Sequence, residues 1–287
     1  MNRLSTNIFR RSDALKSKPD TSAKQPFRVR TGFLILILSA SISLANAEPQ
    51  NQKNEILAEL NAAATRVETV KASLQVGIPH PTAALVQWTE ALVAYRKNPE
   101  FLYLKGYQPL VPLYFLLKSD SDAFSLFVPR VYKVFRGKNK IFDTSIDIDI
   151  ALIPQDIILA LKPLRINDTD HTEWKLAKDQ TAFELTVKDK EGKILRKIII
   201  DSSEHVRYQV EYNDAGFPYL EIWKDDWRDT GSIFFPYEIK MKRSLPKKNE
   251  LVLKFKEIRP NEKLEEKLFQ DTFPKDAEVV ELKESSG

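Results

Sequence analysis

Residues 101–136 decide the fold, and they read FLYLKGYQPLVPLYFLLKSDSDAFSLFVPRVYKVFR. Aromatic and aliphatic runs of six or seven residues alternate in this stretch with breaks of two to five residues that contain proline, serine or aspartate. Such runs favour β-strands, and such short breaks suit the tight turns of an antiparallel sheet. The stretch therefore predicts a meander of four strands, at 101–107, 113–119, 123–128 and 131–136.

The same alternation of apolar and polar residues continues on both sides of the meander. Val67–Ile78 and Ala91–Tyr95 predict two strands before it. Further strands are predicted after it at 183–188, 194–200, 206–212, 217–224, 233–241 and 251–255. Ten or so antiparallel strands, without an internal repeat or a low-complexity linker, indicate a single domain over roughly 52–282.

Two segments have a helical pattern instead. An alanine-rich segment with isoleucine and leucine at helical spacing predicts a helix over 52–65. A second helix is predicted over 153–161, where Pro154 takes the first-turn position that proline favours. Residues 262–269 predict a short helical turn. Strands in long series with few helices between them place the chain in the α+β class.

Strands with one apolar face bury only that side, so a long curled sheet encloses a concave apolar surface. A helix is ~10 Å wide, and two short helices cover only part of such a surface. Two outcomes stay open at this point. Side chains fill the concavity completely, or an apolar cavity remains between the sheet and residues 153–162.

The N-terminal part has the pattern of a secretory signal. An uncharged apolar run at 33–44 follows basic residues and ends at Ala45-Asn46-Ala47, an A-x-A cleavage pattern. The run is shorter than the ~20 residues that a membrane-spanning helix needs. We therefore predict that 1–47 is a cleaved signal peptide and that 48–287 is the mature domain.

The amino-acid composition indicates the compartment to which the chain is exported. It has no cysteine, which excludes disulfides, thiolate metal sites and a lipid-modified N-terminal cysteine. Export without cysteines indicates a bacterial periplasm. A twin-arginine signal at Arg10-Arg11 and an uncleaved membrane anchor are the alternatives to ordinary export and cleavage.

The basic charge of the chain belongs to its leader. The 287 residues carry a formal net charge of +4, but residues 1–47 hold 8 basic and 2 acidic residues. The predicted mature domain keeps 36 basic and 38 acidic residues and is close to neutral. A near-neutral domain does not call for nucleic acid as a partner, and none is predicted.

Catalytic and metal-binding patterns are weak. Three histidines and 8 glycines argue against a His-rich metal centre and a glycine-rich phosphate loop. Zinc-protease, nucleophile-elbow, P-loop and dinucleotide-binding motifs do not occur. Asp143, Asp147 and Asp149 have the spacing of an acidic metal cluster, although a solvated strand face beside a turn is the favoured explanation. We predict no metal, no cofactor and no enzymatic activity.

Two charged segments can be interpreted either as structural turns or as functional sites. Asn167–His171 could hold a cation, but it lacks the glycine and terminal glutamate of a calcium loop, which favours a polar turn. Asp225–Asp229, with Trp223 and Trp227 beside it, could contact a partner or a sugar. The tip of a hairpin with a packed tryptophan is the simpler prediction for that segment.

Several strand-and-turn motifs occur in a characteristic order. Tyr95–Gly106 (YRKNPEFLYLKG) has the form of a hairpin around a proline turn, and Leu117–Gly137 contains the next two strand pairs. Phe235–Ile258, followed by Asn261 and Phe273-Pro274, forms the closing motif. In this order the motifs, which span most of residues 55–275, resemble the LolA/LolB-like family of periplasmic lipoprotein carriers and lipoprotein-sorting domains.

The resemblance implies a strongly curved antiparallel sheet that forms an unclosed β-barrel with helices as a lid. It implies a periplasmic carrier that binds acyl chains of lipoproteins or lipids in an apolar cavity and moves them towards the outer membrane. An inner-membrane donor protein and an outer-membrane acceptor protein are the implied partners. The side chains expected to contact the acyl chains are Leu102, Leu104, Leu126, Ile157, Ile158, Leu161, Val206, Tyr208, Val210, Ile233 and Phe235.

The sequence departs from the family pattern at the hairpin turn. Glu100 stands where the family has glycine, and no arginine follows to hold the lid shut. Two other functions therefore stay open. The same fold with a filled core would serve as an interaction module in an envelope complex, and pairs of acidic residues would serve a hydrolase.

Overall fold

The structure is a computed structural model, and it describes residues 38–79, 86–139, 153–167, 170–176, 181–245, 248–270 and 272–282. The chain divides into two units, Met1–Pro49 and Gln50–Gly287, and the fold below is that of the second unit. Most of the predicted signal peptide lies outside the described residues, so its cleavage stays a prediction.

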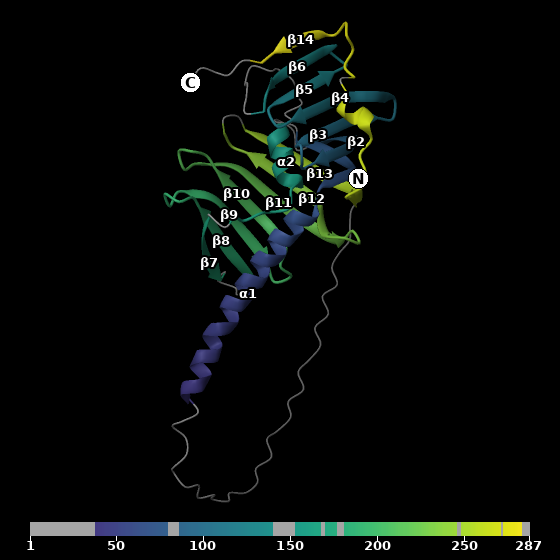
Figure 1. Ribbon diagram of the computed structural model, residues 1–287. Coiled ribbons are helices and arrows are strands. Elements are labelled where there is room, and N and C mark those ends of the chain that lie inside the picture. Colours follow the sequence, from purple (N-terminus) through teal and green to yellow (C-terminus); the bar gives the residue numbers. More distant parts are fainter. Residues whose placement is uncertain are drawn as a thin grey trace, which may run out of the picture. The chain divides into compact units, whose positions relative to one another are not determined.

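The described residues form one open sheet of fourteen strands. The strands are β1 (Thr69–Pro79), β2 (Val86–Arg96), β3 (Phe101–Gln108), β4 (Val111–Asp120), β5 (Ala123–Val128), β6 (Lys133–Lys138), β7 (His171–Leu176), β8 (Ala182–Lys188), β9 (Ile194–Asp201), β10 (Val206–Tyr212), β11 (Pro218–Asp229), β12 (Phe234–Arg243), β13 (Asn249–Pro260) and β14 (Glu278–Glu281). Their spatial order is β14-β6-β5-β4-β3-β2-β1-β13-β12-β11-β10-β9-β8-β7. Because β14 and β7 form two separate edges, the predicted unclosed, curved sheet is confirmed (Figure 1).

The strands follow the predicted meander closely, and every predicted strand overlaps an observed one. The patterns missed the two edge strands. β7 reads HTEWKL and β14 reads EVVE, and both are short and polar, as edge strands often are. β14 also pairs parallel to β6, which corrects the prediction of a purely antiparallel sheet.

Three helical segments accompany the sheet. α1 (Leu38–Arg66) begins earlier than the predicted helix at 52–65, and it contains the predicted cleavage site after Ala47. α2 (Pro154–Leu161) has proline in its first turn, as predicted. A 3-10 turn, η1 (Glu266–Phe269), lies within the short helical segment expected at 262–269.

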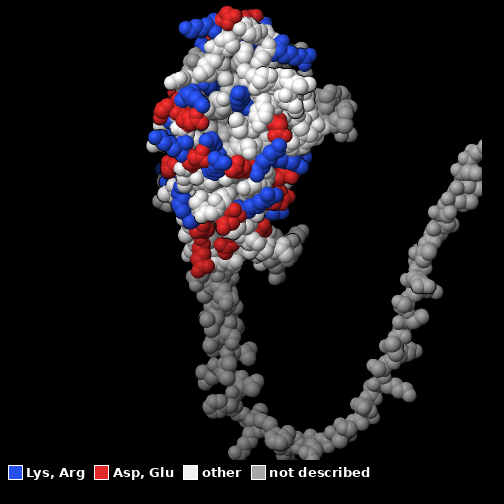
Figure 2. Space-filling view, turned by 90° about the vertical axis from the view of Figure 1, so that its right-hand side faces the viewer, with Lys and Arg blue, Asp and Glu red and all other residues white. Residues whose placement is uncertain are grey.

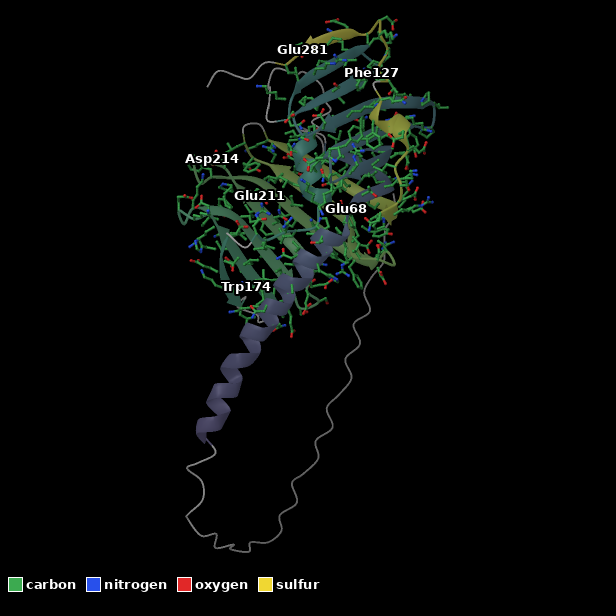
Figure 3. The ribbon with its side chains drawn as sticks, viewed as in Figure 1. Glu68, Phe127, Trp174, Glu211, Asp214 and Glu281 are labelled. Carbon is green, nitrogen blue, oxygen red and sulfur yellow. The ribbon has the colours of Figure 1, made fainter. Side chains whose placement is uncertain are left out.

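Both helices contribute to apolar clusters with one face of the sheet, here called the inner face. α2 brings Ile157 and Ile158 into a cluster with residues of β1–β6 and β11–β13, and it lies in front of the middle of the sheet in Figure 1. Ile56 and Leu60 of α1 pack with the far end of the sheet, including Ile198 of β9 and the edge residue Trp174 that Figure 3 labels. The helices therefore cover neighbouring parts of one face.

The outer face is covered differently. The segment after η1 packs on the meander, where Phe273 contacts a small cluster that includes Phe127 and Leu116. Elsewhere exposed cross-strand pairs cover the surface, such as Lys254 with Glu238. Figure 2 shows Lys and Arg interspersed with Asp and Glu on one face of the molecule. Among the described residues, no helix combines the length and apolarity needed to cross a membrane.

Candidate functional site

The inner face has a packed half beneath α2. Five residues predicted to contact acyl chains lie there, each less than 5% exposed: Leu102, Leu104, Leu126, Ile157 and Ile158. They belong to one continuous cluster in which α2 fills the concavity between the strands. The structure therefore brings these residues together as a packed and buried core.

An open pocket of about 470 Å³ lies next to this packed half. α1 forms one wall, the end of α2 and the segment after it form a second, and β10–β12 form the floor. Four predicted residues line it: Leu161, Val206, Ile233 and Phe235. The further lining residues are Ile56, Glu59, Leu60, Ala63, Ala160, Lys162, Pro163, Leu164, Ser203, Glu204, His205, Lys224, Trp227, Phe234 and Pro236. The pocket is apolar on most sides and has the size of a small-molecule site.

The two remaining predicted residues, Tyr208 and Val210, lie on the outer face. A bulge in β10 between Val206 and Tyr208 shifts the alternation by one residue, so that the inner face passes from Val206 to Gln209. The Tyr208 hydroxyl donates to Glu221 Oε2 at 2.6 Å and its ring lies 5.2 Å from that of Trp223. Neither residue reaches the pocket.

Trp227 lines the pocket next to an irregular position of β11. The predicted hairpin tip at 225–229 is instead the end of β11. Asp226 has a φ of 54° there, and neither Asp226 nor the opposite Tyr237 is paired, while the register with β12 is the same on both sides. Trp227 also stacks on His205, with ring centroids 4.8 Å apart and planes 3° from parallel. The Trp227 Nε1–H is buried and has no acceptor among the described residues.

Lys224 is the buried charge of the pocket, and the sequence analysis missed it. It is 4% exposed and lines the floor from β11. Burial lowers its pKa from 10.5 to about 8, although Glu211 opposes the shift. The signal was present, because Leu220, Ile222 and Lys224 share one side of a predicted strand whose other members are buried.

Lys224 lies near a buried polar cluster on β9 and β10. Gln209 donates to Glu211 Oε1 at 2.5 Å, and the Arg196 guanidinium lies 3.5 Å from the same oxygen. Figure 3 labels Glu211 on β10. Burial raises the pKa of Glu211, against the opposing influence of Arg196. Among the described residues, no carboxylate lies within 4 Å of the Lys224 amine.

Ion pairs hold both ends of α2. At its first turn, Asp156 accepts from Arg243 of β12 at Nε (2.7 Å) and at Nη2, with both side chains buried. Just after its last turn, Lys162 pairs with Glu100. The residue that departs from the family pattern at the hairpin turn thus holds the end of α2 beside the pocket.

The structure does not support the acidic segments as metal sites. Asp143, Asp147 and Asp149 lie outside the described residues, as does part of Asn167–His171. Within the described ranges, no group of three or more His, Asp or Glu could hold a metal ion.

Comparisons with known proteins bear on the fold. No protein-family model matches the chain, and no curated protein does. A solved outer membrane lipoprotein-sorting protein domain, described as putative, from Vibrio parahaemolyticus matches with a TM-score of 0.52 and 15% identity, over 75% of this chain and 94% of that one. A DUF1329 family protein from Desulfovibrio piger matches with a TM-score of 0.54 and 12% identity, over 76% and 95%. The chain thus has a fold similar to that of lipoprotein-sorting domains, as its sequence motifs predicted.

Proposed function

We propose that this chain is a periplasmic, non-enzymatic carrier that binds an acyl chain of a lipid or lipoprotein in the pocket between α1, α2 and β10–β12. The observation that carries the proposal is the pocket itself, an open space of about 470 Å³ with mostly apolar walls. The likeness in fold to a lipoprotein-sorting domain supports it. Moving the ligand towards the outer membrane, between a donor and an acceptor protein, completes the proposal.

The volume sets how much ligand fits. A cavity of about 150 Å³ holds the six carbons of benzene, so 470 Å³ holds about 19 carbon atoms at the same packing. That is one long acyl chain rather than several. Burying sixteen carbons at about 0.8 kcal/mol each supplies about 13 kcal/mol before the costs of ordering the ligand.

The chain would lie along Leu161, Val206, Ile233 and Phe235, which line the pocket. The predicted contacts to Leu102, Leu104 and Leu126 require α2 to leave the sheet, since those side chains are buried beneath it. A second or longer chain would therefore need this movement.

Displacement of a fluorescent fatty acid tests the proposal. Ile233→Trp fills the pocket and should abolish saturable displacement, while Ile199→Trp, at an outer-face position of β9, should leave it unchanged. Native mass spectrometry should show one retained lipid per chain. Absence of both signals, together with specific capture of an envelope protein, would replace the carrier with the interaction module.

A further inference from the structure

The pocket carries one feature that an acyl chain alone does not use. Lys224 presents an amine to the floor of an otherwise apolar space, with no carboxylate of the described residues within 4 Å. The other charged lining residues are paired or exposed: Glu59 pairs with Arg66, Lys162 pairs with Glu100, and Glu204 is exposed. Lys224 is therefore the charge that a ligand in the pocket would meet.

A second donor comes from the same strand. The Nε1–H of Trp227 is buried without an acceptor among the described residues. Its ring is held by the parallel stack on His205, which in turn lies 5.2 Å from Phe234 at the pocket's edge. Two donors, one charged and one neutral, thus belong to the lining, and neither has a carboxylate of the described residues at hydrogen-bond distance.

The two buried donors indicate which head group a bound ligand would have. A buried donor left without an acceptor destabilises a complex, and a buried cation does so more strongly. An acyl chain that ends in an ester or amide, or in a hydroxyl, would supply no charge to Lys224. An anionic head would satisfy both donors, and charge-assisted hydrogen bonds are the stronger kind.

We propose that the pocket binds a single-chain lipid with an anionic head, and that Lys224 and Trp227 hold the head while the chain lies along the apolar walls. The head is a carboxylate, as in a free fatty acid, or a phosphate, as in a single-chain glycerol phosphate. This inference rests on the proposed acyl-binding function and narrows it. It separates free anionic lipids from acyl chains linked to protein by ester or amide bonds.

Matched sixteen-carbon ligands test the head group. The fatty acid, the alcohol, the methyl ester and the monoacyl glycerol phosphate are titrated against the purified mature chain by displacement of a fluorescent probe. An ionic hydrogen bond predicts that the acid binds about 10- to 100-fold more tightly than the alcohol or the ester. A phosphate ligand that binds more tightly than the acid would identify phosphate as the natural head.

Variants assign the effect to the two donors. Lys224→Met should remove the preference for the acid over the alcohol, and Trp227→Phe should reduce it several-fold while keeping an aromatic ring beside His205. Lys240→Met is the matched control, because Lys240 lies on the next strand and faces outwards beside Trp223. The control should keep the full preference.

The outcomes separate this inference from the proposed function. Equal binding of acid, alcohol and ester by the unaltered protein, or an acid preference that survives Lys224→Met, overturns the head-group site and leaves the acyl carrier standing. Binding of none of the four ligands overturns both.

Discussion

Replacing Lys224 with methionine should stabilise the ligand-free protein. Burial lowers the pKa of Lys224 from 10.5 to about 8, so keeping the amine protonated at pH 7 destabilises the folded state. At about 1.4 kcal/mol per pH unit, the free energy of unfolding should rise by about 3 kcal/mol in the variant. Methionine has a similar length, and Glu211 keeps Arg196 and Gln209 as neighbours, so no new charge is orphaned.

Chemical denaturation at pH 7, followed by circular dichroism, measures this difference. In a thermal scan the same effect corresponds to a rise in Tm of about 6–12 °C for a domain of this size. The difference should shrink as the pH rises from 8 to 10.5, because the folded amine loses its proton in this range before the unfolded one does. Tyrosines with raised pKa values titrate in both proteins and cancel in the comparison.

An unchanged or lower stability of the variant at pH 7 would refute the reasoning. It would mean that the amine is not desolvated, and the case for an anionic ligand would lose its physical basis. If the amine is desolvated, a saturating fatty acid should raise the Tm of the unaltered protein and raise that of Lys224→Met far less.

Three further predictions concern α2 and the pocket. Asp156→Ala should lower the free energy of unfolding by about 3–5 kcal/mol in urea denaturation, because it leaves Arg243 buried without its partner. Glu100→Gln should lower it by less than about 1 kcal/mol, and added salt should remove the difference, because the pair with Lys162 is partly exposed. Affinity for saturated fatty acids should rise with chain length and level off near about 19 carbons, as measured by calorimetric titration.

The sequence predicted the sheet well because alternation of apolar and polar residues records burial directly. The assignment of side chains to the inner or outer face failed where the backbone departs from that alternation. The bulge after Val206 moves Tyr208 and Val210 to the outer face, and the left-handed backbone at Asp226 precedes Trp227, which lines the pocket. Neither a single inserted residue nor a single left-handed residue leaves a mark in composition or period, so these assignments required the structure.

The sequence analysis missed Lys224 for a different reason. Its position matched the buried side of the predicted strand, but lysine is rarely buried, so its residue type gave no reason to single it out. A charged residue at an apolar position of the pattern is evidence for a buried functional group, provided that the strand continues beyond it. Here β11 continues to Asp229, which encloses Lys224 within the sheet.

The two ion pairs of α2 differ in strength, and their placement bears on how the pocket works. Breaking the buried pair of Asp156 and Arg243 costs about 3–5 kcal/mol, whereas breaking the partly exposed pair of Lys162 and Glu100 costs less than about 1 kcal/mol. Lys162 lines the pocket, so the weakly held end of α2 is the one beside the ligand. A chain too long for the pocket would therefore displace this end first, with the Asp156 end still attached to β12.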